Sequence, residues 1–195
     1  PLLFRGLKHL TGATPQERCV EKAIRHNIAI YSAHTSMDAY LHGVSGRIAE
    51  KLGIPNYRIL IPSDTNTNAG LGVIGELPTP MTCNALLEHI AHVFATEKAV
   101  LRWVEGAANE IKAVAICGGA GADLVNEAIA QGADVYVSAD FKYHEMQAVA
   151  GQIAVVDMDH WVSEQYTREI FEQLLSPYIH TRVAKEDKSP VEYWR

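Results

Sequence analysis

The hydrophobic positions of the chain follow two alternating periods, one typical of strands and one typical of helices. Short, nearly continuous apolar runs predict buried strands at residues 27–32, 57–63, 71–77, 99–104, 111–117, 133–138 and 153–158. Between them, apolar residues recur every third or fourth position and predict amphipathic helices at residues 15–26, 45–54, 79–94, 122–131, 143–150 and 161–175. This alternation indicates the α/β class and favours parallel pairing in the second half of the chain.

The start of the first predicted helix carries a capping signal. Thr14 is the expected N-cap, Pro15 fits the first helical position, and Glu17 stands three residues after the cap. This spacing is typical of a capping box, in which each of the two side chains accepts a hydrogen bond from the other residue's backbone amide. We therefore expect a helix that begins at Pro15.

Composition and charge narrow the class of protein. The 195 residues are 48% hydrophobic and 21% charged, which are ordinary values for a globular domain. Seventeen basic residues against 23 acidic ones give a net charge of −6, and no basic cluster exceeds two residues. We therefore expect no nucleic-acid or membrane-surface partner, because both require clustered Lys and Arg. No apolar stretch approaches the roughly 18 residues that a membrane span needs.

Cysteine usage indicates the compartment. Cys19, Cys83 and Cys117 are far apart, and none belongs to a Cys-x-x-Cys pair. An odd number of scattered cysteines favours reduced thiols in a cytoplasmic protein over a disulfide framework or a thiolate zinc site.

The segment VDMDHWVSE (156–164) contains the first candidate for chemistry. His160 and Glu164 are four positions apart, so on a helix their side chains share one face and can bind one ion. They follow a predicted parallel strand, and open α/β sheets bind ligands at the carboxyl ends of their strands. The alternative is a polar helix start, with Glu164 favoured by the helix dipole and His160 as a polar cap. The spacing alone leaves both interpretations open.

Two other predicted strands also end in polar residues. His34 and Asp38 follow the first predicted strand, and Asp140 and His144 follow the strand at 133–138. An ionised carboxylate beside a buried strand needs a partner, although Asp38 could instead cap a helix while His34 makes a local hydrogen bond. Together these residue types suit a divalent metal such as zinc, iron, manganese or nickel rather than calcium.

A glycine-rich turn, ICGGAGAD (116–123), joins a predicted strand to a predicted helix. Backbone N–H groups in such a turn can hold an anion. The segment lacks the Gly-Lys-Ser/Thr of a P-loop and the full spacing of a dinucleotide fingerprint. A tight connection without a ligand is therefore favoured over a nucleotide-binding turn.

Taken together, these motifs resemble the GTP cyclohydrolase I type 2 homologue family, also called the NIF-three-like family, a set of metal-binding α/β proteins. The matching segments are collinear with the family and span nearly the whole chain. They are PLLFRGLK (1–8), YSAHTSMDAYLHGVSGRIAEKLGI (31–54), GLGVIGEL (70–77), AVAICGGAGADLVNEAIAQGADVYVSADFKYHEMQA (113–148) and VVDMDHWVSE (155–164).

The resemblance implies a three-layer α/β fold of two packed lobes with mixed sheets. The lobes would comprise residues 1–104 and 105–195, without an inserted domain, because the interval from Gly75 to Lys112 is too short for one. The resemblance also implies a site for two divalent metal ions per subunit between the lobes, and a ring-shaped homohexamer.

The resemblance further implies roles for individual residues. The positions that match direct metal ligands are Asp38, His160 and Glu164. The positions expected to line or orient the site, and to include the catalytic groups, are His34, Asp140 and His144.

Three positions depart from the family pattern. In relatives a His-His pair that binds metal precedes the proline matching Pro1, and this sequence does not contain that pair. Ser36 stands where relatives tend to have Asn, and Asp159 stands where they tend to have Gly. We therefore expect either an empty or partly occupied metal site, or a chain that is a fragment of a longer protein.

The leading functional hypothesis is a metal-dependent hydrolase, similar to a type 2 GTP cyclohydrolase, that acts on a small polar substrate such as a nucleotide. Two metal ions would activate a bridging water. Asp38 could bridge the ions, and His34 or His144 could act as general base or orient a ligand. The alternative is a non-catalytic metal-binding or regulatory protein that interacts with other proteins, because the same ligands would serve both.

Overall fold

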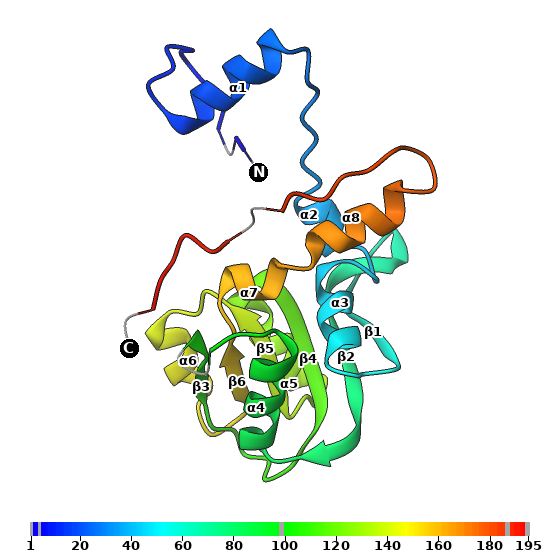
Figure 1. The fold of residues 1–195 in the computed structure, drawn as a ribbon. Helices are drawn as coiled ribbons and strands as arrows, with labels where there is room; N and C mark the ends of the chain where they lie inside the picture. The colour runs from blue at the N-terminus through cyan, green and yellow to red at the C-terminus, as the bar shows by residue number, and fades with distance from the viewer. Residues whose placement is uncertain (1, 4, 98–99, 186–187, 194–195) are drawn as a thin grey trace. The chain divides into compact units, whose positions relative to one another are not determined.

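The computed structural model of the chain describes residues 2–3, 5–97, 100–185 and 188–193 (Figure 1). The chain forms two compact units, residues 1–37 and residues 38–195. The smaller unit contains helix α1 (Pro15–Arg25), and the larger unit contains the sheet and the helices that pack on it.

Helix α1 starts where the sequence predicts. Thr14 Oγ1 accepts a hydrogen bond from the Glu17 amide at 3.2 Å, and Pro15 opens the helix. The Glu17 carboxylate, however, accepts hydrogen bonds from the hydroxyl and amide of Thr11, each at 2.7 Å, and from the Ala13 amide at 3.3 Å. These donors, the Thr11 hydroxyl first among them, lower the pKa of Glu17. The predicted cap is confirmed at Thr14, whereas Glu17 stabilises the loop that precedes it.

Glu17→Gln is expected to remove the acid sensitivity of this loop. The folded pKa of Glu17 lies below its ordinary value of 4.5, so its stabilising contribution is present above about pH 4.5 and is lost as the pH falls through the lowered pKa. In an NMR titration from about pH 7 to about pH 3, the amide shifts of Thr11 and Ala13 should move in the wild type and stay constant in the variant. Equal movement in both proteins would show that Glu17 is not the responsible group.

The predicted buried strand at residues 27–32 is wrong. The segment has no strand conformation, and none of the described strands pairs with it. Ile28 and Ile30 are 58% and 53% exposed. A strand depends on a neighbour for its backbone hydrogen bonds, so the apolar pattern of 27–32 is insufficient without a partner strand.

The larger unit is built on one mixed sheet, which in the described residues has six strands in the order β1-β2-β4-β5-β6-β3. The strands are β1 (Tyr57–Ser63), β2 (Asn66–Met81), β3 (Arg102–Val104), β4 (Ile111–Ala120), β5 (Val135–Ala139) and β6 (Ala154–Asp157). Strands β4, β5 and β6 are parallel, whereas β1, β2 and β3 pair antiparallel with their neighbours. The predicted parallel pairing in the second half is confirmed.

Helices of the larger unit pack on both faces of this sheet. The helices that follow residue 38 are α3 (Val44–Lys51), α4 (Cys83–Val93), α5 (Val125–Ala130), α6 (Tyr143–Val149), α7 (His160–Glu164) and α8 (Thr167–Leu175), with a 3-10 turn at Ala122–Leu124. The short helix α2 (Thr35–Asp38) includes the boundary between the two units. Cys117 and Tyr136 join the apolar core under α5 and α6, whereas Gly118 lies against α3 on the opposite face. This arrangement confirms the predicted α/β fold class. The division into lobes at 104/105 stays a prediction.

Several predicted boundaries shift for identifiable reasons. The helix expected at 79–94 begins at Cys83, because β2 continues through Met81 and Thr82 then caps the helix. The helix expected at 161–175 is two helices, α7 and α8, separated at residues 165–166. The strand expected at 99–104 is observed at 102–104, and residue 99 lies outside the described part.

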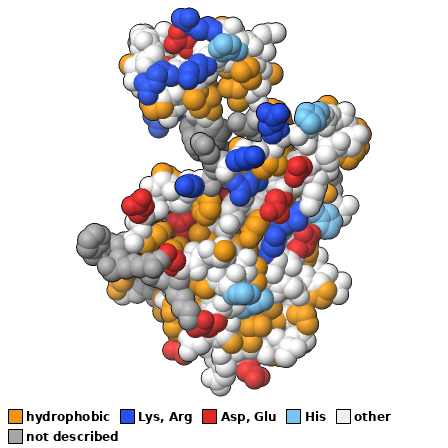
Figure 2. Space-filling model, in the orientation of Figure 1, with side chains coloured by type: hydrophobic (Ala, Val, Ile, Leu, Met, Phe, Trp, Pro, Cys, Tyr) orange, Lys and Arg blue, Asp and Glu red, His pale blue; other side chains and the backbone are white. Residues whose placement is uncertain are grey.

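The surface of the larger unit carries mixed charge. On the face seen in Figure 2, basic side chains lie next to acidic ones. The ion pairs of the larger unit include Lys51–Glu169 and Arg47–Glu50. Within the described residues, no helix combines the length and apolar character that crossing a membrane requires.

Candidate functional site at the carboxyl ends of the parallel strands

Helix α7 places His160 and Glu164 directly after β6. Asp159 is its N-cap, and the Asp159 carboxylate accepts a hydrogen bond from the Val162 amide at 3.1 Å. One helical turn later, Glu164 Oε1 lies 3.2 Å from His160 Nε2. Both side chains are partly exposed, so the pair is open to ligands.

Asp140 contacts the other nitrogen of the same imidazole. It follows β5, and its Oδ2 lies 2.7 Å from His160 Nδ1. The φ of Asp140 is +59°, a conformation that is uncommon for residues other than glycine. The carboxylates of Glu164 and then Asp140 raise the pKa of His160 to about 9, against the opposing effect of burial. The metal-free imidazole is therefore protonated at neutral pH, and a bound metal ion would replace a proton.

The glycine turn at the end of β4 is tied to α3 by the Ser45 hydroxyl and to α7 by the Ser163 hydroxyl. The Gly118 amide donates to Ser45 Oγ at 3.2 Å, and the Gly119 amide donates to Ser163 Oγ at 2.9 Å. Ser163 Oγ in turn donates to the His160 carbonyl at 2.8 Å. These two amides are therefore engaged within the protein, which fits the interpretation of a tight connection without an anion.

Because Gly119 has no side chain, the Glu164 carboxylate can occupy the space beside it. The φ of Gly119 is +66°, and a Cβ at this position would lie 2.5 Å from Glu164 Oε1 and 3.5 Å from His160 Cε1. The sequence shows that a turn is present, but not that the turn faces α7.

Asp38 lies near the same turn. After burial, which is the main cause, the charge of Asp38 helps to raise the pKa of the Cys117 thiol to about 11. Cys117 directly precedes Gly118, so Asp38 acts electrostatically at the start of the glycine turn. Its predicted role as a metal ligand stays a prediction.

The two other histidines of the predicted set have local contacts. His34 belongs to the smaller unit, has a φ of +43°, and its Nδ1 lies 3.1 Å from Thr35 Oγ1. His144, on α6, has Nδ1 3.5 Å from Gln147 Oε1 and an edge contact with the Tyr143 ring. Neither contact shows a link to His160, and the roles of both histidines stay predictions.

The atoms around His160 suit one side of a metal site. Nε2 and Glu164 Oε1, 3.2 Å apart, could both bind an ion at about 2.0–2.2 Å. A carboxylate on Nδ1, here that of Asp140, is the usual partner that orients a ligating imidazole. In the described part of the chain, however, no group of three or more His, Cys, Asp or Glu side chains is arranged to hold a metal ion. His160 and Glu164 therefore offer two metal-binding atoms, and a complete metal site requires further ligands.

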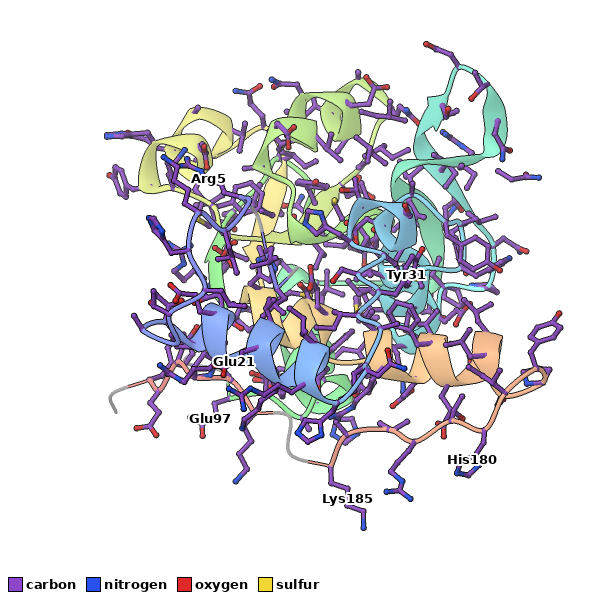
Figure 3. The ribbon with its side chains drawn as sticks, turned by 90° about the horizontal axis from the view of Figure 1, so that it is seen from above. Arg5, Glu21, Tyr31, Glu97, His180 and Lys185 are labelled. Carbon is purple, nitrogen blue, oxygen red and sulfur yellow. The ribbon has the colours of Figure 1, made fainter. Side chains whose placement is uncertain are left out.

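The C-terminal segment lines the space beside the pair. A cavity of about 450 Å³ is bounded by Asp140, His160, Trp161 and Glu164 on one side and by residues 189–191 on the other. The Tyr193 hydroxyl donates to Asp159 Oδ2 at 2.5 Å. Earlier in the same segment, His180 and Lys185 point outward (Figure 3). The sequence shows no periodicity in this segment, so nothing in it signals the contact with the N-cap of α7.

Tyr193→Phe is expected to loosen the C-terminal segment without unfolding the larger unit. A hydrogen bond to a charged group contributes about 1.5–3 kcal/mol, and less here because Tyr193 is 40% exposed. Amide exchange of residues 189–193, followed by mass spectrometry, should become several-fold faster. Tyr178→Phe is the matched control, since Tyr178 is 84% exposed. Unchanged protection in Tyr193→Phe would mean that other contacts hold the segment.

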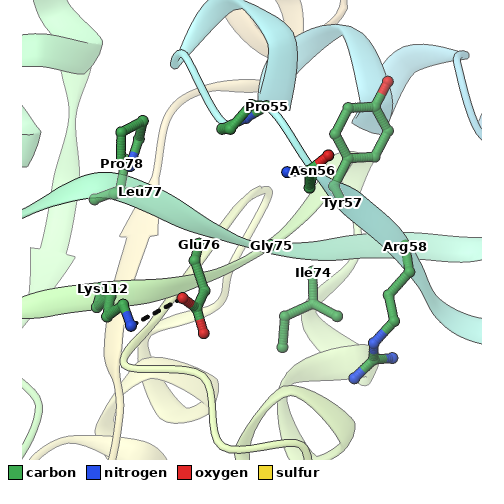
Figure 4. A pocket seen from close by; sticks show the side chains of 10 residues that line it. All are labelled: Pro55, Asn56, Tyr57, Arg58, Ile74, Gly75, Glu76, Leu77, Pro78 and Lys112. Atoms are coloured by element: carbon green, nitrogen blue, oxygen red, sulfur yellow. Dashed lines mark ion pairs between the residues drawn. The ribbon is translucent and has the colours of Figure 1, made fainter.

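A second hollow lies against β1 and β2. It has a volume of about 670 Å³ and is formed by residues 55–58, residues 74–78 and Lys112 (Figure 4). The Lys112 Nζ atom pairs with Glu76 Oε2 at 2.9 Å. None of its lining residues is a histidine or a cysteine, so it offers less for catalysis than the cluster at α7.

The fold and the cluster at α7 define a class: an α/β protein with a histidine–carboxylate site where parallel strands end. Residues 1–190 match the Duf34/NIF3 (NGG1p interacting factor 3) family. The chain belongs to this family, and the resemblance expected from its motifs is confirmed.

Individual relatives agree with this assignment. A Streptococcus pneumoniae protein named GTP cyclohydrolase 1 type 2 homolog is 32% identical over 191 residues, or 95% of this chain and 68% of that protein. A Streptomyces coelicolor protein of the same name is 30% identical over 168 residues, or 84% and 59%. A Schizosaccharomyces pombe protein named Protein NIF3 homolog is 29% identical over 188 residues, or 92% and 66%. The matches span 59% to 68% of the length of these relatives.

Solved structures share the fold. Staphylococcus aureus protein SA1388 superposes with a TM-score of 0.90 and 23% identity, covering 100% of this chain and 78% of that one. A Bacillus cereus protein related to NIF3 superposes with a TM-score of 0.85 and 21% identity, covering 100% and 81%. At these identities the likeness establishes the fold.

Proposed function

We propose that the chain forms part of a dinuclear metal site and acts as a metal-dependent hydrolase on a small polar substrate such as a nucleotide. The observation that carries this proposal is one imidazole held between two carboxylates. His160 has Glu164 at 3.2 Å on Nε2 and Asp140 at 2.7 Å on Nδ1. This is the arrangement expected when Nε2 and a neighbouring carboxylate oxygen bind the same ion.

Each residue has a defined task in this proposal. Asp140 accepts a hydrogen bond from Nδ1–H and so directs Nε2 toward Glu164. His160 and Glu164 would then hold one ion. Asp38 would be a further metal ligand, as the family resemblance implies. Bound divalent ions would lower the pKa of a water molecule and polarise the bond under attack. Zinc, iron, manganese and nickel suit a donor set of imidazole and carboxylate.

The substrate class is supported by the relatives. Two of those described above are named GTP cyclohydrolase 1 type 2 homologs, which makes GTP the first nucleotide to test. A general base is also needed, and His34 and His144 are the candidates that the motif positions supply.

Metal analysis and turnover assays on one preparation test this proposal. The purified protein, loaded in turn with each of the four metals, is analysed for bound metal and assayed with GTP, phosphoesters and amides. If the protein that is tested contains the His-His pair expected from the family, we expect two ions per subunit and metal-dependent turnover of at least one substrate. A protein that binds both ions and turns over none of these substrates would refute the hydrolase.

A non-catalytic metal-binding or regulatory protein is the second candidate. It is favoured by the family description, NGG1p interacting factor 3, which names an interaction rather than a reaction. Metal binding without turnover, together with a stable protein partner, would support it over the enzyme.

We also propose that the protein is a cytoplasmic homohexamer. The family resemblance supports the hexamer, and light scattering coupled to size exclusion tests it. The three cysteines are free thiols in the structure, which supports a reducing compartment.

A further inference from the structure

Asp157 is a buried carboxylate that no predicted role uses. It is the last residue of β6 and only 3% exposed. Its Oδ2 accepts a hydrogen bond from the Phe141 amide at 3.1 Å, and its Oδ1 accepts one from the Asp159 amide at 3.1 Å. One side chain therefore holds the backbone at two places, the segment after β5 and the segment before α7.

Arg102 completes this arrangement from the edge of the sheet. It lies on β3, opposite Asp157 in the β3–β6 pairing. Its guanidinium forms an ion pair with the Asp157 carboxylate and also donates to the Phe141 carbonyl at 2.7 Å. The amide and the carbonyl of Phe141 are thus both engaged by the Asp157–Arg102 pair.

The two residues whose amides Asp157 holds, Phe141 and Asp159, are neighbours in the chain of Asp140 and His160, which contact each other in the candidate site. Phe141 follows Asp140, and Asp159 precedes His160. Asp140 and Asp159 have φ values of +59° and +70°, conformations that cost free energy unless surrounding contacts hold them. The Asp157–Arg102 pair supplies such contacts on both sides of the Asp140–His160 hydrogen bond.

The Asp157 carboxylate is buried, whereas the Arg102 side chain is 55% exposed. Removing a charge from water is costly, and a well-packed apolar residue of similar size often stabilises a fold equally well. A carboxylate with several geometrically defined partners, by contrast, fixes the relative position of the segments that it joins.

We propose that Asp157, supported by Arg102, is the positioning residue of this site. It fixes Asp140 relative to His160 and thereby sets which imidazole nitrogen faces Glu164. The consequence for metal binding rests on the proposed function, whereas the positioning of the imidazole does not.

The test compares variants by two readouts. Asp157→Asn keeps the shape of the side chain but places a donor where two amides and a guanidinium need an acceptor. Arg102→Met removes the ion pair, and Arg102→Lys restores the charge. The first readout is Co²⁺ affinity from the visible absorption of the bound ion. The second is the imidazole ¹⁵N spectrum of His160 in the metal-free protein.

We expect Asp157→Asn to lower Co²⁺ affinity by about 10- to 100-fold and Arg102→Met by about 10-fold, as for other residues that orient metal ligands. Arg102→Lys should recover part of the loss. The His160 Nδ1 resonance should shift in Asp157→Asn as its hydrogen bond to Asp140 weakens.

Val155→Ala separates positioning from general destabilisation. Val155 lies on the same strand and is fully buried, so this variant should lower the melting temperature without changing Co²⁺ affinity or the imidazole spectrum. An Asp157→Asn protein with the wild-type spectrum and affinity, or a Val155→Ala protein with the same losses, would overturn the proposal. A wild-type protein that binds no Co²⁺ would defeat the metal function, and the imidazole spectrum would still decide the positioning role.

Discussion

His160→Ala is expected to lower the affinity of the site for a divalent metal by at least about 100-fold. Removing a residue that only orients a metal ligand typically costs about 10- to 100-fold, and His160 is proposed as a ligand itself. Its Nε2 lies 3.2 Å from Glu164 Oε1, and its Nδ1 lies 2.7 Å from Asp140 Oδ2. The variant would lose the nitrogen donor and leave the two carboxylates without the imidazole between them.

Zinc titration of metal-free protein in competition with a chelator measures this effect. His92→Ala is the matched control, because His92 is exposed on α4 and is not among the residues around the cavity at α7. We expect His92→Ala to bind zinc as the wild type does. If His160→Ala also did so, His160 and Glu164 would not be ligands, and their spacing would reflect the polar helix start.

Gly119→Ala is expected to damage the site more than it damages the fold. The added Cβ would lie 2.5 Å from Glu164 Oε1. That oxygen is the end of a flexible side chain, so Glu164 can move aside, but it then leaves its place next to His160 Nε2. We expect a metal affinity at least about 10-fold weaker, with a loss in unfolding free energy of about 1–2 kcal/mol from the left-handed backbone.

Gly132→Ala separates these two contributions. Gly132 has a φ of +76° and no atom within 4 Å of an added Cβ. The Gly132→Ala variant should therefore lose only the unfolding free energy that the left-handed backbone costs an alanine. Chemical denaturation should show similar losses in the two variants, and zinc titration should show a loss only in Gly119→Ala. Equal zinc affinity in both would mean that the position of the Glu164 oxygen does not matter for binding.

Most of the sheet could be predicted because its signals are local. Strands β4, β5 and β6 are covered on both faces, so their sequences are nearly continuous apolar runs. The β1 prediction, 57–63, agrees with the structure. The segment 27–32 has the same kind of pattern, yet it is not a strand, because pairing depends on a neighbour that a local pattern does not reveal.

The candidate site could be predicted in part for the same reason. The spacing of His160 and Glu164 corresponds to about one turn of any α-helix, so their contact follows once α7 forms. The contact of Asp140 with His160 spans 20 positions and depends on β5 lying beside β6. The contact of Tyr193 with Asp159 spans 34 positions and belongs to a segment without periodicity.

The sequence by itself determined the α/β class, the parallel strands, the family, and the pair on α7, because periodicity, helical spacing and collinear motifs are properties of the chain. Only the tertiary structure decided that Asp140 contacts His160, that Gly119 makes room for Glu164, and that Asp157 holds the neighbouring backbone. The physical reason is that these contacts depend on strand order and register, which arise when distant segments pack together.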